Sequence, residues 1–134
     1  MAAQDEYREH EENLKQIHAI CTKLSMHAAE TFHEALQSIW FLFTLLQLES
    51  NASSFSPGRM DQYLLPFYQR DKLKGILNDQ SALEMIEALW LKFNQIVYMR
   101  NAHSASFFAG FPIGFNIALG GQDPEGKSAE NELS

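Results

Sequence analysis

The sequence predicts a mainly α-helical fold with one or two short strands. Apolar residues recur at helical spacing through most of the chain. They make up 46% of the 134 residues, which is the usual share for a globular protein. A single segment, 113–119, alternates between apolar and small or polar residues with period two, as a strand does. The length suits one domain, residues 1–134, with no second domain.

Two helices are predicted before the first long loop, over 4–24 and 31–48. In the first, Leu14 and Ile17 lie on a narrow apolar stripe, which is typical of a helix on a surface. The second is apolar nearly all round, so we expect protein on every side of it. Its most apolar run, 39–46, is much shorter than the roughly 20 residues of a membrane span, and we expect no membrane contact.

Two further helices are predicted over 60–74 and 79–100. Pro66 lies inside the first and should kink or interrupt it, because proline removes one backbone hydrogen bond and crowds the preceding turn. Asn78 or Asp79 is expected to cap the second helix. Its buried face is predicted to hold Leu83, Ile86, Trp90, Phe93 and Val97.

The predicted strand has no partner of comparable quality in the sequence. It is followed by Gly120 and Gly121, a polar turn over 122–127 and a helix start at 131–134. A strand without partners leaves its backbone N–H and C=O groups unpaired. We therefore expect residues 113–119 to pair with strands that this sequence does not supply.

Composition narrows the classes of function. The net charge of −7 and the lack of clustered Lys and Arg argue against nucleic-acid binding. Cys21 is the only cysteine, which excludes an internal disulfide and fits a cytoplasmic protein, and residues 1–12 are acidic and polar, unlike a secretory signal. The five histidines show neither HExxH spacing nor an i, i+4 pair, so we expect no metal site.

The polar stretch 49–58 directly follows the most apolar helix, and loops beside buried helices commonly carry functional sites. Four blocks in and beyond this stretch occur in a recognisable order: Glu49-Ser50-Asn51, Gly58-Arg59-Met60-Asp61-Gln62-Tyr63-Leu64, Phe111-Pro112 and Gly120-Gly121-Gln122. Together they resemble the glycyl radical enzymes, the pyruvate formate-lyase-like superfamily, and most closely its dehydratase and lyase branch. The likeness covers the chain from about residue 14 onward.

The resemblance implies that residues 1–134 are an internal part of the pyruvate formate-lyase (PFL) domain. This part would comprise helices and the first strand of a ten-stranded α/β barrel. Residues 25–29 depart from the family, which often has prolines there. The implied enzyme is formate acetyltransferase-like, or a radical dehydratase or lyase that cleaves a C–C, C–O, C–N or C–S bond of a small-molecule substrate.

The radical-bearing residues of that family have no counterpart in this sequence. Family members use a cysteine in a Gly-Cys loop and a glycyl radical installed by a radical-SAM activating enzyme. Cys21 lies on the first predicted helix and lacks that context. The resemblance therefore implies no catalytic residue and no cofactor bound by this chain, which should be inactive alone. Its partner would be a complementary part of the same anaerobic, cytoplasmic enzyme, or a second copy.

The resemblance also implies residues of the substrate pocket. Ser54 matches a loop position beside a substrate hydroxyl in dehydratase-like members, and Phe111 matches an aromatic position of the pocket wall. Arg59 and Asp61 are expected to be structural, either as an ion pair or by bracing the loop. The second choices for substrate contact are Asn51, Ser53, Phe55 and Ser56.

A stand-alone helical interaction module without catalytic activity is the alternative interpretation. The apolar faces over 39–46 and 83–97 would then bury against a partner protein. The sequence leaves open the substrate, the bond cleaved, and whether the chain is a piece of a split enzyme or a truncated remnant.

Overall fold

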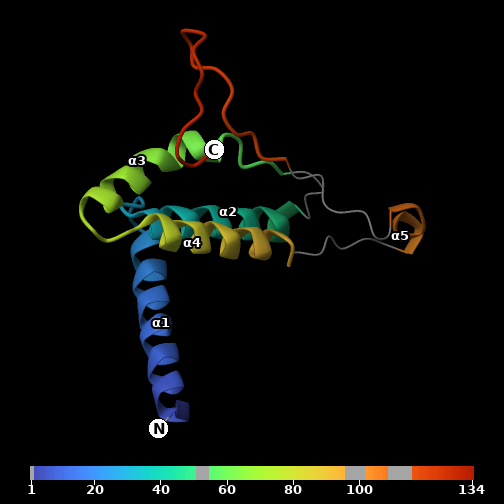
Figure 1. Cartoon of the computed structure of the whole chain (residues 1–134). Helices are drawn as coiled ribbons and strands as arrows, with labels where there is room; N and C mark the ends of the chain where they lie inside the picture. The colour runs from blue at the N-terminus through green and yellow to red at the C-terminus, as the bar shows by residue number, and fades with distance from the viewer. Residues whose placement is uncertain (1, 51–54, 96–101, 109–115) are drawn as a thin grey trace.

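The computed structural model describes residues 2–50, 55–95, 102–108 and 116–134. In these stretches the extended backbone forms two isolated bridges, a parallel one between Gly58 and Ile117 and an antiparallel one between Gln122 and Ser128. The architecture is therefore mainly helical, as predicted. The helices are α1 (Ala2–Leu24), α2 (Phe32–Ser50), α3 (Met60–Leu73), α4 (Asp79–Phe93) and α5 (Ala102–Phe108) (Figure 1).

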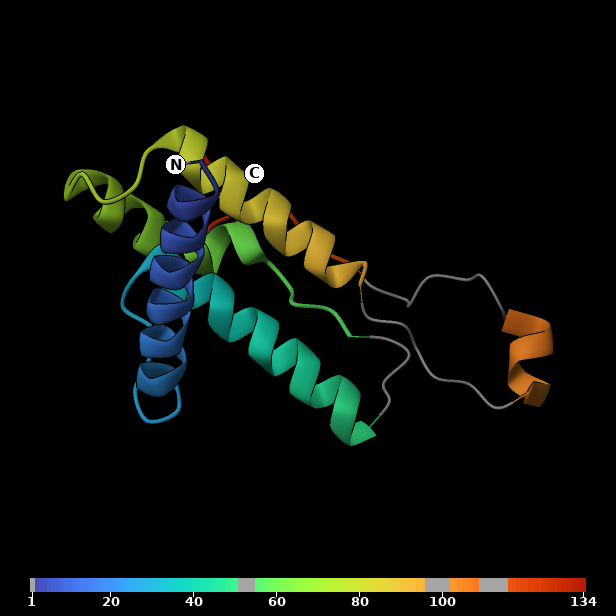
Figure 2. The same cartoon turned by 90° about the horizontal axis from the view of Figure 1, so that it is seen from below.

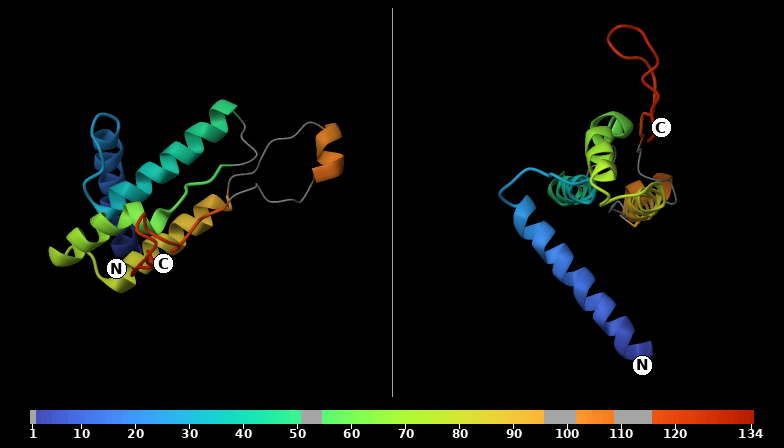
Figure 3. Two further views of the ribbon diagram at one scale, coloured as in Figure 1. Left: turned by 90° about the horizontal axis from the view of Figure 1, so that it is seen from above. Right: turned by 60° about the vertical axis from the view of Figure 1, so that its left-hand side comes forward.

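Three helices pack together and a fourth projects from them. α2 and α4 lie side by side, and α3 contacts the N-terminal end of α2 (Figures 1 and 2). α1 touches α2 close to the turn that joins them and then points away from the other helices (Figure 3). The C-terminal segment, 116–134, lies over α3 and ends beside it (Figure 1).

The core lies between α2, α3 and α4. The ring of Phe43 on α2 packs edge-on against Phe93 of α4, with centroids 5.0 Å apart, and lies 5.5 Å from the ring of Phe55. Phe32 at the start of α2 meets Tyr68 of α3 with ring centroids 6.0 Å apart. Because Phe55 follows α2, this cluster anchors the loop to the helices. The other buried apolar side chains of the cluster are Ala35, Leu36, Met60, Leu64, Leu77, Ala82 and Leu89.

The N-terminus of α2 is capped by two carboxylates. Thr31 and Glu34 form a capping box, in which each backbone N–H donates to the other side chain at 3.2 Å. Asp71 of α3 accepts a hydrogen bond from the backbone N–H of Phe32 at 2.7 Å. Both carboxylates lie at the positive end of the helix dipole, which favours negative charge. The hydrogen bond from Phe32 N to Asp71 therefore joins the start of α2 to α3.

The helices differ from the sequence predictions in three places. α3 continues through Pro66, whose ring lies on the exposed side while Leu64 and Tyr68 hold the same helix in the core. α4 ends at Phe93 rather than near residue 100, because Asn94 forms its C-cap. The short helix α5 was not predicted, since its small residues show no clear period.

The predicted burial of α4 is also partly wrong. Phe93 is buried as predicted, but Leu83 is 50% exposed and Trp90 is 39% exposed, because the side of α4 that enters the core is the one with Ala82, Leu89 and Phe93. Val97 lies outside the described residues. On α2, which we expected to be covered on every side, Leu42, Leu45 and Leu48 are exposed.

The predicted strand is not formed in the part of it that the structure describes. Residues 113–115 lie outside the described stretches, and in 116–119 only Ile117 makes a bridge. One parallel bridge to Gly58 cannot build a ladder. The expected helix start at 131–134 is a turn instead, in which Ser134 N donates to the Asn131 carbonyl at 2.9 Å.

Replacing Pro66 by alanine tests the continuous α3. Alanine restores a backbone N–H in the helix interior, and we expect Pro66→Ala to raise the free energy of unfolding by about 1–2 kcal/mol. Urea unfolding followed by circular dichroism measures the change. Gln69→Ala, at an exposed position of the same helix, is the control and should shift stability by less than about 0.5 kcal/mol. A destabilised Pro66→Ala variant would contradict the prediction.

Candidate functional site

The polar loop predicted to touch substrate is described only from Phe55 onward. Asn51, Ser53, Ser54 and Phe111 lie outside the described residues. The hydroxyl of Ser56 donates to the carbonyl of Asn116 and accepts a long hydrogen bond, 3.4 Å, from Gly58 N. The loop is therefore joined to the C-terminal segment at Ser56, and the proton of that hydroxyl is already engaged.

Arg59 extends from the start of α3 to the same segment. Its guanidinium donates to the carbonyl of Gly120 and, at 3.1 Å, to the carbonyl of Gln122. It makes no ion pair with Asp61, although both residues are described, so the first of the two expected arrangements is wrong. Side chains two positions apart at a helix start point in different directions. Each braces the C-terminal segment by separate bonds.

Asp61 has the most polar contacts in this region although it is only 1% exposed. Its carboxylate oxygen Oδ2 accepts from Gly120 N at 2.6 Å, from the Ser134 hydroxyl at 2.7 Å and from the Gln62 amide at 2.9 Å. Burial alone raises the pKa of Asp61, but these hydrogen bonds together outweigh it and hold the pKa below its ordinary value. The group is therefore a buried carboxylate anion at neutral pH.

Two amides complete the connection between α3 and the C-terminal segment. The Gln62 side chain donates to the Ala129 carbonyl at 2.7 Å, and the Asn131 side chain donates to the Asp61 carbonyl at 3.3 Å. We call Arg59, Asp61 and Gln62, with their partners in 116–134, the α3 latch. Sequence reasoning missed Gln62 and Ser134. Gln62 lies within the block that carried the resemblance, whereas no sequence signal points to Ser134.

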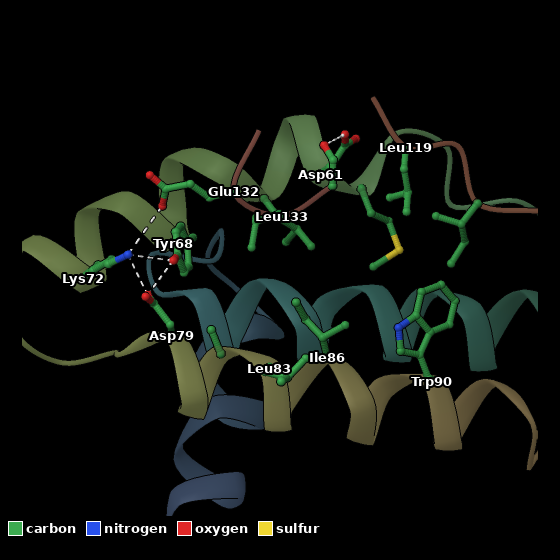
Figure 4. A pocket seen from close by; sticks show the side chains of 15 residues that line it. Asp61, Tyr68, Lys72, Asp79, Leu83, Ile86, Trp90, Leu119, Glu132 and Leu133 are labelled. Carbon is green, nitrogen blue, oxygen red and sulfur yellow. Dashed lines mark hydrogen bonds and ion pairs between the residues drawn. The ribbon is translucent and has the colours of Figure 1, made fainter. Parts of the chain in front are cut away.

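A groove of about 620 Å³ runs between α3, α4 and the C-terminal segment (Figure 4). Its walls are mainly apolar and include Leu83 and Trp90, two α4 side chains that were predicted to be buried and are partly exposed. Asp61 lies at the side of the groove formed by the start of α3 (Figure 4). The groove therefore borders the latch.

One end of the groove holds a polar cluster (Figure 4). The Lys72 ammonium lies 2.6 Å from an Asp79 carboxylate oxygen, 2.9 Å from the Tyr68 hydroxyl and 3.6 Å from Glu132. Hydrogen bonds to Asp79 and then to Tyr68 raise the pKa of Lys72, so it stays a cation at neutral pH. The cluster links α3, α4 and the C-terminal segment, and its charges are paired.

The described residues offer binding and positioning groups. Among them, no three His, Cys, Asp or Glu side chains come together in a group that could hold a metal ion. In the same stretches, no helix is long and apolar enough to cross a membrane. The polar side chains of the latch bind neighbouring segments and hold them in position.

Asp61 should make the latch sensitive to acid. Because its folded-state pKa is lowered, its contribution to stability is complete above the ordinary value of about 3.9 and is lost as the pH falls through the folded-state value. We expect the difference in unfolding free energy between the wild type and Asp61→Asn to be constant from about pH 7 to 5 and to shrink below about pH 4. Urea unfolding at each pH measures it. A difference that persists undiminished to about pH 2 would contradict this expectation.

Comparison with known proteins gives the class of this chain. The family model for pyruvate formate lyase-like proteins matches residues 1–134. Isethionate sulfite-lyase of Nitratidesulfovibrio vulgaris is 34% identical over 136 residues, a match that covers 100% of this chain and 16% of that protein. The chain therefore spans about a sixth of the length of this relative.

Solved structures agree with the sequence match. A structure concerned with 1,2-propanediol dehydration in Roseburia inulinivorans superimposes with a TM-score of 0.85 and 39% identity, covering 94% of this chain and 16% of the other. A glycyl radical enzyme from Archaeoglobus fulgidus gives a TM-score of 0.84 and 36% identity, with 93% and 16% covered. The helices and the latch thus lie in a region shared with glycyl radical enzymes. This chain belongs to the pyruvate formate lyase-like family.

Proposed function

We propose that this chain supplies part of the substrate-pocket wall of a glycyl radical dehydratase or lyase and is inactive alone. The observation that carries the proposal is that the whole chain matches 16% of the length of isethionate sulfite-lyase. Isethionate and 1,2-propanediol, the compounds named for two similar proteins, are both small molecules with a hydroxyl near the group that leaves. A small hydroxylated substrate and cleavage of a C–O or C–S bond follow from that chemistry.

Each predicted site residue has a role in this proposal. Ser54 hydrogen-bonds a substrate hydroxyl, since a serine can both donate and accept, and Phe111 excludes water from the radical intermediate. Asn51 and Ser56 support them. The reactive cysteine and the radical glycine come from residues other than these 134, with the radical installed by a radical-SAM activating enzyme. The assembled enzyme works in the cytoplasm under anaerobic conditions. It consists of this chain with a complementary part of the same enzyme, or it is a homo-oligomer.

The exposed apolar surface of the chain fits this proposal. Leu45 and Leu48 of α2 are 61% and 78% exposed, and Leu91 of α4 is 68% exposed. In part of a larger enzyme, the rest of the protein covers such side chains. Binding of a dye specific for exposed apolar surface by the purified chain favours the enzyme part; a monomer that unfolds cooperatively without dye binding favours the module.

Reconstitution tests the proposed function. The chain is mixed, under strict exclusion of oxygen, with a polypeptide that supplies the Gly-Cys loop and the radical glycine, and with the activating enzyme. We expect a glycyl radical signal by electron paramagnetic resonance and consumption of isethionate or 1,2-propanediol only when both parts are present. Turnover by the 134-residue chain alone would refute the proposal. So would full activity of the other polypeptide without this chain.

A further inference from the structure

Asp61 is the centre of the contacts that join the loop side of α3 to the C-terminal segment. One oxygen, Oδ2, accepts hydrogen bonds from Gly120 N and from the Ser134 hydroxyl, which lie at the two ends of the folded-back part of the segment. Charge-assisted hydrogen bonds of this length are about twice as strong as neutral ones. A single buried carboxylate therefore holds the segment at two points.

Neighbouring bonds bring the latch close to the predicted pocket. Two residues before Gly120, the backbone N–H of Ala118 donates to the Gly58 carbonyl at 3.2 Å. Two residues before Ala118, the carbonyl of Asn116 accepts from the Ser56 hydroxyl. Ser56 lies two residues after the predicted contact Ser54, and Asn116 lies five residues after the predicted contact Phe111. The Asp61–Gly120 bond therefore lies next to the two bonds that join the loop to the C-terminal segment.

We propose that Asp61 is a positioning residue of the enzyme: by binding Gly120 N and the Ser134 hydroxyl, it sets the position of the C-terminal segment against the loop that ends at Ser56. The proposal rests on the proposed function, because it assigns Asp61 to the wall of that pocket. Asp61 itself touches no substrate. Its buried carboxylate acts through the backbone at Gly120, and a small displacement of a positioning element is enough to weaken substrate binding.

The first test uses the 134-residue chain and needs no activity. In Asp61→Ala, hydrogen exchange at the amides of Ala118 and Gly120 should accelerate by roughly 10- to 100-fold, the equivalent of losing one or two hydrogen bonds to a charged group. Exchange in the middle of α2 should not change. Glu130→Gln, at an exposed carboxylate of the same segment, is the matched control and should leave all rates unchanged. Unchanged exchange at Gly120 in Asp61→Ala would overturn the proposal.

Two further variants keep the test decisive if Asp61→Ala folds poorly. Asp61→Asn keeps one acceptor oxygen and should accelerate exchange less than Asp61→Ala. Ser134→Ala removes only the second arm, at an exposed position, and should loosen the C-terminal end more than Gly120. If Asp61→Asn and Ser134→Ala both exchanged their amides at the wild-type rates, the attachment of the segment at two points would be wrong.

The second test uses the reconstituted enzyme. Asp61→Ala should raise KM about tenfold and change kcat much less, and Asp61→Asn should recover part of the loss, because a misplaced wall weakens substrate binding before it affects the radical step. Faster exchange together with unchanged KM and kcat would overturn the positioning role. A wild-type mixture without turnover would instead contradict the proposed function, while the exchange result would still decide whether Asp61 holds the segment.

Discussion

Replacing Phe43 by alanine is expected to lower the free energy of unfolding by about 3–5 kcal/mol. Phe43 is 1% exposed and lies between the rings of Phe93 on α4 and Phe55 in the loop. Removing its ring leaves a cavity at the junction of α2, α4 and the loop, in addition to the lost transfer of the ring from water. Small domains are stable by about 5–15 kcal/mol, so this one change removes a large part of the total. Urea unfolding monitored by circular dichroism measures it.

The control for this prediction lies on the same helix. Leu48 is 78% exposed, and Leu48→Ala should change the free energy of unfolding by less than about 0.5 kcal/mol. Phe43→Leu keeps much of the volume and should give an intermediate loss that remains measurable if the alanine variant does not fold. A loss below about 1 kcal/mol for Phe43→Ala would show that the three elements do not share this core.

Replacing Asp71 by alanine should have the second largest effect, a loss of about 2–3 kcal/mol. Asp71 is 2% exposed, and its carboxylate accepts the backbone N–H of Phe32, which is itself completely buried. Alanine leaves that N–H without an acceptor in a place that water does not reach, and it removes negative charge from the positive end of α2. Urea unfolding at neutral pH measures the loss.

Two variants distinguish the cap from a general effect of charge. Asp71→Asn retains an acceptor oxygen for Phe32 N and should lose only about 1 kcal/mol. Asp79→Ala removes a carboxylate that is paired with Lys72 but largely exposed, and it should cost less than about 1 kcal/mol. If Asp71→Ala were no more destabilising than Asp79→Ala, the hydrogen bond between Asp71 and the start of α2 would not contribute measurably to the free energy of unfolding.

Local patterns predicted the existence and order of the four main helices. Apolar residues at helical spacing and a capping residue at Asn78, which accepts from Ser81 N at 2.8 Å, are written in consecutive residues. The same patterns misplaced the end of α4 and missed α5. Helix ends depend on which side chains the rest of the molecule buries, and Asn94 stops α4 just after its last core residue, Phe93.

The candidate site was predicted less completely than the helices. The block 58–64 contains Arg59 and Asp61, which were expected to brace the loop or to pair with each other. The structure shows them bonded to Gly120 and Gln122 and not to each other. Two charges near each other in sequence suggest a pair, whereas backbone groups sixty residues away leave no signal in the sequence.

The sequence by itself determined the helical order, the family and the inability of residues 116–119 to form a sheet with other parts of the described chain. These properties follow from local patterns and from motifs of consecutive residues. Only the tertiary structure decided that Asp61 binds Gly120 and that Asp71 caps α2. A buried carboxylate must find donors, and which backbone N–H groups come within reach depends on how distant segments pack.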